Sequence, residues 1–249
     1  MSWIETQSPN FVARHAEEDD SDADEVLELL EGTREELAGV FEQSAGGLTV
    51  VIHSNQLQLL LAQPVAAALR LLTTPASRRY VAGWYSRSEI HVLAPRLLSR
   101  RASNVPGSLE MLMLSPASLY AQLTAGLNNP GLPPPFTFSN WFRAPRWAWL
   151  SAGAGQWFSG QTVHARPAIA SRLRDGRRPS FPPGLRDAQL LGGSVFDLVA
   201  SESGTQAAIE LATTAPQSTA EIISRAFPGR SFADTEGVWR AHLARLGGV

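Results

Sequence analysis

Histidine is the residue type in this chain that could bind a metal ion or transfer protons near neutral pH. The five histidines are His15, His53, His91, His164 and His242. Three of them, His15, His53 and His91, fall on predicted strands, so a sheet could bring them together around a metal. No two histidines have the H-x-x-x-H spacing, and none of the three has an acid or a second histidine at ligand spacing. We therefore expect half-exposed strand histidines and no metal site.

Other catalytic chemistries lack the residues that they need. The chain has no cysteine, which excludes disulfides, thiolate catalysis and Cys-ligated zinc. It also has no lysine, so a G-x-x-x-x-G-K-[ST] phosphate loop is impossible. No G-x-S-x-G elbow is present for a serine nucleophile. The glycines at 153, 155, 192 and 193 lie inside helical patterns, where we expect them to permit close helix packing.

Composition narrows the class of protein. With 249 residues, 44% of them hydrophobic, the chain can bury one substantial core, or one core with two lobes. A net charge of −2 argues against a general nucleic-acid binder. The start of the chain lacks the basic and apolar regions of a secretory signal, and the richest apolar run, 57–72, is interrupted by polar residues and a proline. We expect a cytoplasmic protein that binds neither membranes nor nucleic acids.

Hydrophobic periodicity predicts the elements that must position these residues. Strands are expected at 10–16 and 48–53, and a hairpin at 81–85 and 89–94. The acidic run 17–25 lacks the glycine and spacing of a calcium loop, so we expect it to be the solvated N-terminus of a helix that continues to 41. Further helices are predicted at 54–72, 108–127, 144–160, 164–175, 184–203, 205–214, 218–226 and 234–246.

The most specific motif is W-L-S-A-G-A-G-Q-W-F-S-G at 149–160. It resembles the "W-L-x-E-G-x-A-x-[YW]" helix of the gluzincin metallopeptidases, particularly the bacterial peptidase MA-like domains. Three other segments agree in order: 3–11 is similar to the opening strand of that domain, 194–204 to its "S-F-V-x-x-L…Y-G" helix, and 239–243 to its "W-R-x-x-L". The resemblance therefore covers almost the whole chain.

In such enzymes two histidines of an H-E-x-x-H helix bind zinc, the glutamate between them is the general base, and a glutamate on the following helix is the third ligand. The resemblance places this motif on 116–120, with Pro116 and Tyr120 at the histidine positions and Ala117 at the base position. Ala152 then occupies the third-ligand position. The alanine and proline side chains have no donor atom, so this set cannot build the zinc site, and the resemblance implies a domain without this cofactor.

Two further positions of the family pattern have also changed. Gln156 stands at the acidic position that supports the third ligand, and Gln189 stands where a tyrosine often precedes the "S-F-V" helix. The resemblance implies an α+β, gluzincin-like single domain over 1–249, with a small mixed sheet and helices at 1–105 and a mostly helical lobe at 106–249. A cleft would lie between the lobes.

Three functions are consistent with this interpretation. The first is an inactive metallopeptidase homologue that binds a peptide or protein in an open cleft, with 89–94 as the edge strand that pairs with it. The second is a hydrolase with a relocated active site, and the third is a structural or regulatory module whose cleft is closed, with Tyr120 in the vacated zinc space. The candidate cleft residues are Ile90, Val92, Tyr120, Trp149 and Trp157.

Overall fold

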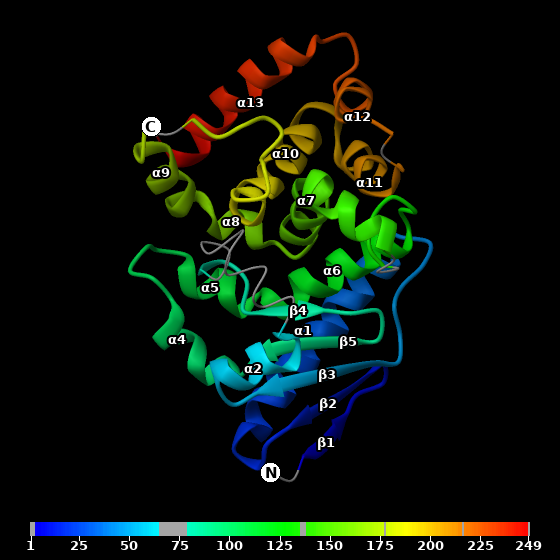
Figure 1. The fold of residues 1–249 in the computed structure, drawn as a ribbon, viewed down its shortest axis with the longest axis vertical. Helices are drawn as coiled ribbons and strands as arrows, with labels where there is room; N and C mark the ends of the chain where they lie inside the picture. Colours follow the sequence, from blue (N-terminus) through cyan, green and yellow to red (C-terminus); the bar gives the residue numbers. More distant parts are fainter. Residues whose placement is uncertain (1–2, 65–78, 135–137, 177, 216, 249) are drawn as a thin grey trace.

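A computed structural model describes residues 3–64, 79–134, 138–176, 178–215 and 217–248. These form a mixed α/β fold around a five-stranded sheet with the strand order β1-β2-β3-β5-β4 (Figure 1). The strands are β1 Ile4–Gln7, β2 Phe11–His15, β3 Leu48–His53, β4 Gly83–Tyr85 and β5 Glu89–Leu93. The three central strands run parallel, whereas β1 and β4 are antiparallel to their neighbours.

The predicted strands at 10–16 and 48–53 and the predicted hairpin are confirmed, but the predicted edge strand is wrong. β5 pairs with β3 on one side and with β4 on the other. Ser86 closes the turn between β4 and β5, because its backbone N–H donates to the Glu89 carbonyl at 2.7 Å. The segment 89–94 therefore lies inside the sheet and has no free edge to offer to a peptide.

The two faces of the sheet are built from alternating residues of each strand. Ala13, Val50 and Ile90 are register partners across the parallel strands, and all three are fully buried in the main core. Helices α1 Asp20–Ala38 and α6 Ser115–Leu127 pack on this face. On the opposite face Val51, His91 and Trp84 are register partners, and α2 Gln56–Ala62 contacts β3 and β5.

Most predicted helices are present in the described residues, with shifted ends. The predicted helix 108–127 is divided at Leu114, because Ser115-Pro116 starts a new helix, where proline is compatible with the first turn. The predicted helix 54–72 begins as α2, and its second half lies outside the described residues. The other helical elements are η1 Glu17–Asp19, η3 Pro95–Leu97, α4 Leu98–Arg101, α5 Ser108–Met113, α7 Phe138–Phe158, α8 Gln161–His164, α9 Arg166–Arg174, α10 Ala188–Ser203, α11 Thr205–Thr213, α12 Thr219–Ala226 and α13 Phe232–Gly247.

Helix α6 is the central element of the molecule. It packs against α1 and β5 on one side and against α7 on the other, and every residue from Ser115 to Gly126 is buried. Helix α10 packs in turn on α7, so that α6, α7 and α10 form successive layers away from the sheet (Figure 1). None of the helices in the described residues is both long and apolar enough to cross a membrane.

The acidic run differs from the expected solvated helix end. Glu18 is exposed, but Asp19 is fully buried and Asp22 is 6% exposed. Arg96, which follows β5, explains the difference: its guanidinium donates to Asp19 Oδ1 at 2.8 Å and to Glu18 Oε1 at 2.8 Å, and its backbone N–H donates to Asp22 Oδ1 at 3.0 Å. The run is therefore an anchor between the start of α1 and the end of β5.

Replacing Arg96 by methionine is expected to lower the free energy of unfolding by about 2 kcal/mol, because Asp19 then stays buried without its cation. Urea unfolding measures this change. The matched control is Arg225→Met, which removes the exposed ion pair with Glu221 and should cost only a few tenths of a kcal/mol, on the order of an isolated surface pair. Equal losses in both variants would contradict the anchoring role of Arg96.

Candidate functional site

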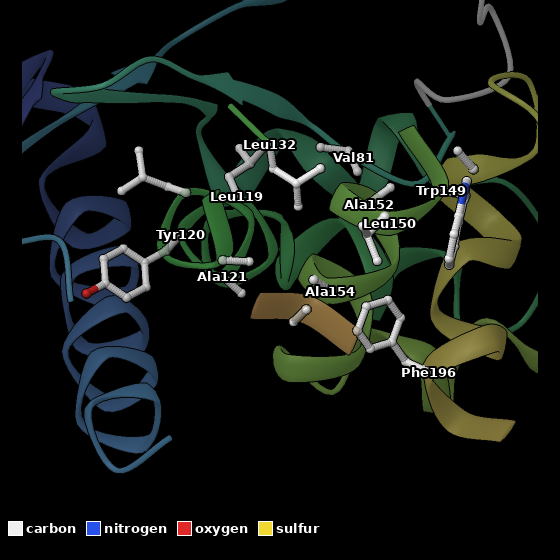
Figure 2. Packing of buried hydrophobic residues seen from close by; sticks show 14 of the residues in the cluster. Val81, Leu119, Tyr120, Ala121, Leu132, Trp149, Leu150, Ala152, Ala154 and Phe196 are labelled. Atoms are coloured by element: carbon white, nitrogen blue, oxygen red, sulfur yellow. The ribbon is translucent and has the colours of Figure 1, made fainter. Parts of the chain in front are cut away.

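Tyr120 does not occupy the space beside Ala152 that the resemblance assigned to it. Its hydroxyl donates to the Ala45 carbonyl at 2.8 Å, and its ring packs edge-on against Phe11, with centroids 5.5 Å apart. In Figure 2 the Tyr120 side chain lies beside α1, whereas Ala152 lies on a different helix, near Leu150. Pro116, four residues earlier on α6, belongs to the same side of the helix as Tyr120.

The side of α6 that faces α7 carries Ser118 and Gln122 instead. A Cβ atom added to Gly155 of α7 would lie 2.5 Å from Gln122 Cγ and 2.7 Å from the Ser118 carbonyl oxygen. These two residues are four apart, and they stand two positions beyond the predicted histidine positions, Pro116 and Tyr120. The contact with Gly155 of α7 is therefore made by Ser118 and Gln122, whereas Tyr120, at a predicted histidine position, contacts Ala45 and Phe11.

The other predicted positions lie in packed helix interfaces. Ala152 is 2% exposed, and Gln156 is 1% exposed. The Gln156 amide donates to the Ala188 carbonyl at 3.2 Å and accepts from the Gly193 backbone N–H at 2.7 Å, so this side chain joins α7 to α10. Gln189 is half-buried next to Ala188 at the start of α10. Gln156 thus has a structural role that its position in the motif did not indicate.

The predicted cleft residues do not line an open groove. Ile90 and Val92 face the core and are 0% and 1% exposed, and Trp149 is 2% exposed. Trp157 is partly buried against the same core. A surface hollow of about 440 Å³ lies elsewhere, beyond the C-terminal end of α6, and is lined by Glu42, Gln43, Arg87, Gly126, Leu127, Asn128, Pro130 and Pro134.

The α6–α7 interface nevertheless retains polar groups. Ser118 Oγ and Gln122 Nε2 are buried, and neither atom has a hydrogen-bond partner in the described ranges of the chain. A buried polar atom without a hydrogen-bond partner lowers the free energy of unfolding by about 1–3 kcal/mol. A close-packed apolar side chain at the same place does not carry this cost.

Replacing Gln122 by methionine, which has a similar volume, is therefore expected to raise the free energy of unfolding by about 1 kcal/mol. Urea unfolding of the variant measures this gain. Gln156→Met is the matched control, because both ends of that amide are hydrogen-bonded, and it should destabilise the protein. A loss of stability in Gln122→Met would contradict the geometry of this interface.

A second constellation lies on the opposite face of the sheet. His53 Nε2 and His91 Nδ1 are 3.0 Å apart, and His91 Nε2 is 3.2 Å from Glu89 Oε2. The strand register explains why the two histidines are in contact. His91 is opposite Val51 on the parallel strand β3, and His53 is two residues further along the same face. The expectation that these histidines are half-exposed is wrong, since His53 is 4% and His91 7% exposed.

The hydrogen bonds fix the protonation of both rings. A carboxylate only accepts, so His91 Nε2–H donates to Glu89 and His91 Nδ1 is left as an acceptor. His53 Nε2–H then donates to His91, and His53 Nδ1 keeps its lone pair. That nitrogen is buried and has no hydrogen-bond partner among the residues that the structure describes. Burial lowers the pKa of His53 from 6.5 to about 4, with His91 acting in the same direction, and burial also lowers the pKa of His91 against the opposing effect of Glu89.

Tryptophan rings enclose the pair. Trp84 lies flat on His91, with centroids 3.7 Å apart and planes 16° apart, and its Nε1–H donates to the Leu59 carbonyl of α2 at 3.3 Å. The Trp3 ring is perpendicular to the His53 ring, with centroids 6.3 Å apart, and Trp3 is half-exposed. The third strand histidine, His15, does not join them, because its ring nitrogens contact the Thr6 hydroxyl and the Ala16 carbonyl, each at 2.8 Å.

The histidine pair could not have been predicted from spacing. The separation of 38 residues between the two side chains is not a ligand motif, and only the parallel pairing of β3 with β5 makes them neighbours. Across the described part of the chain, no group of three or more His, Asp or Glu side chains is arranged to hold a metal ion. Comparison of the chain with protein-family models, curated proteins and solved structures gives no match.

Proposed function

We propose that this protein is a catalytically inactive relative of the gluzincin metallopeptidases whose former active-site region has become a packed core. The observation that carries the proposal is the contact between α6 and α7 at Gly155. A single added Cβ atom at Gly155 would overlap with Ser118 and Gln122. A zinc ion with its water and a substrate carbonyl needs much more room than one methyl group. The proposal therefore favours a closed module over an open peptide-binding cleft.

The order of the elements supports the same assignment. The mixed sheet precedes α6, and α7, which carries the W-L-x-x-G motif, follows directly and packs against α6. The resemblance requires this order of sheet, first site helix and second site helix. At the third-ligand position, Ala152 is buried and has no donor atom in its side chain. With a closed centre, the proposed role of the module is to bind a peptide or protein partner through its outer surface.

The relocated-hydrolase alternative is less well supported. Its candidate base is His53, whose free Nδ1 is buried. A general base must come within hydrogen-bond reach of the substrate proton. Trp3 and Trp84 instead pack around the histidine pair.

Zinc content and peptidase activity test the loss of catalysis. After dialysis without chelator, elemental mass spectrometry is expected to find a zinc-to-protein ratio near zero, and added zinc should produce no cleavage of casein. Stoichiometric zinc together with chelator-sensitive cleavage would overturn the proposal.

Hydrogen exchange tests the closed centre separately. Backbone amides of α6 around Tyr120 and of α7 at 152–156 are expected to exchange only on global unfolding, because every residue of these two stretches is buried. The matched comparison is α12 Thr219–Ala226, a short outer helix that should exchange faster. Fast exchange around Ala152 in the folded protein would favour an open cleft instead.

A further inference from the structure

We propose that His53 and His91 form a binding site for a two-coordinate monovalent metal ion, with Cu⁺ as the biological ion. This inference is independent of the proposed function, because the pair lies on the opposite face of the sheet from α6. It rests on the relative orientation of the two rings, on the carboxylate behind one of them, and on the nitrogen of the other, which has no partner within the described part of the chain.

The two imidazoles meet edge to edge. Their nitrogens are 3.0 Å apart, their centroids 5.3 Å apart, and their planes differ by 17°. At this nitrogen separation, so long a centroid distance requires the two nitrogens to lie nearly on the line between the rings. Nitrogen ligands that oppose each other on one line suit a linear d¹⁰ ion such as Cu⁺ or Ag⁺. Tetrahedral zinc instead needs ligands that converge from four directions.

Binding of the ion also requires a new position for the proton that lies between the two rings. In the metal-free protein one proton, on His53 Nε2, lies between the two rings. The ion takes the place of this proton, and the proton moves to His53 Nδ1, which is buried and is not hydrogen-bonded to any described residue. With nitrogen–metal bonds of about 2 Å, the rings must separate by roughly 1 Å. No redox step is involved.

Glu89 completes the site. His91 keeps its Nε2–H, which donates to the Glu89 carboxylate at 3.2 Å. A ligating histidine that donates its other ring N–H to a carboxylate is the usual arrangement behind a protein-bound metal, and it raises the basicity of the ligand. The carboxylate also balances the added positive charge. Because only two donors are needed, the site is compatible with the absence of larger ligand clusters in the described residues.

Trp84 shields the site and reports on it. Its indole lies 3.7 Å from the His91 ring, so a heavy ion bound to His91 should quench its fluorescence. The half-exposed Trp3 lies perpendicular to the His53 ring.

The test is a titration of the full-length protein with silver nitrate in chloride-free buffer, followed by calorimetry and tryptophan fluorescence. Ag⁺ is expected to bind at one per chain and to quench fluorescence, and Cu⁺ kept reduced by ascorbate should compete with it. His53→Gln and His91→Gln should lose this binding, while the control His164→Gln keeps it. Glu89→Gln, at a partly exposed position, should fold normally and weaken binding about tenfold.

Four results would overturn the proposal: no stoichiometric Ag⁺ binding in the wild-type protein, binding unchanged in Glu89→Gln, binding that survives in a folded His53→Gln protein, or Zn²⁺ bound as tightly as Ag⁺. Circular dichroism establishes whether each variant is folded. Binding through methionine sulfur would survive in the histidine variants, so these also distinguish that source of silver affinity.

Discussion

Replacing Gly153 by valine is expected to lower the free energy of unfolding by at least about 3 kcal/mol, the largest effect of any substitution considered for this protein. Gly153 is where α7 crosses α10, and an added Cβ would lie 2.7 Å from the Gly192 carbonyl oxygen and 2.9 Å from a ring carbon of Phe196. The Gly192 carbonyl belongs to the backbone of a buried helix, so no side-chain rotation can relieve the overlap. Relief requires the two helices to separate.

Separation of these helices would also break the contacts of Gln156 with α10. Urea unfolding measures the loss of stability, and alanine at the same position should give a smaller loss in the same direction. The matched control is Gly32→Ala on α1, where an added Cβ has no neighbour within 4 Å. That substitution should raise stability by about 0.4–1 kcal/mol, because glycine has more conformational freedom to lose on folding. A tolerated valine at 153 would contradict the helix crossing.

The second large effect is a loss of stability in acid that originates at the histidine pair. The pKa of His53 is about 4 in the folded protein and 6.5 when unperturbed, because burial and the neighbouring His91 disfavour its charged form. Between these values the unfolded chain binds a proton at His53 that the folded chain does not. The free energy of unfolding therefore falls as the pH falls from 6.5 to 4, by about 3 kcal/mol in total. The lowered pKa of His91 acts in the same direction.

The measurement compares the metal-free wild-type protein with His53→Gln by urea unfolding at pH 7.5, 6, 5 and 4. Glutamine can still donate to His91 but does not titrate, so the variant should lose less stability in acid than the wild type. His164→Gln controls for the removal of an ordinary histidine and should keep the wild-type slope. Carboxylates titrate in the same pH range in all three proteins. The informative quantity is therefore the difference between the proteins in how steeply the free energy of unfolding changes with pH. Identical slopes in wild type and His53→Gln would rule out a neutral, buried His53.

Closed packing and acid sensitivity concern opposite faces of one sheet. The first follows from the contact between α6 and α7, where glycines permit the backbones to approach closely. The acid sensitivity follows from the burial of His53 and His91, which contact each other, with Glu89 next to His91. A protein whose centre is closed can therefore still have a second, smaller site, which the titration with Ag⁺ would reveal.

Most of the helices and strands follow from patterns in the sequence. Alternation at 10–16, the β-branched run at 48–53 and the turn residues before Glu89 predicted the strands. The glycines at 153, 155, 192 and 193 predicted close helix packing, since they leave room that any other residue fills. The chain also lacks cysteine and any H-x-x-x-H pair, and no fold can supply either.

The contacts between residues that are far apart in the chain depend on the assembled fold. Strand order is not encoded in the periodicity of one strand, so the position of 89–94 inside the sheet, between β3 and β4, could not be predicted. The same holds for the rotation of α6, which turns Tyr120 toward Phe11 and Ser118 toward α7, because a helix buried on all sides has no polar face to orient it. His53 and His91 became a pair through the register of two parallel strands, and that register is a property of the assembled sheet.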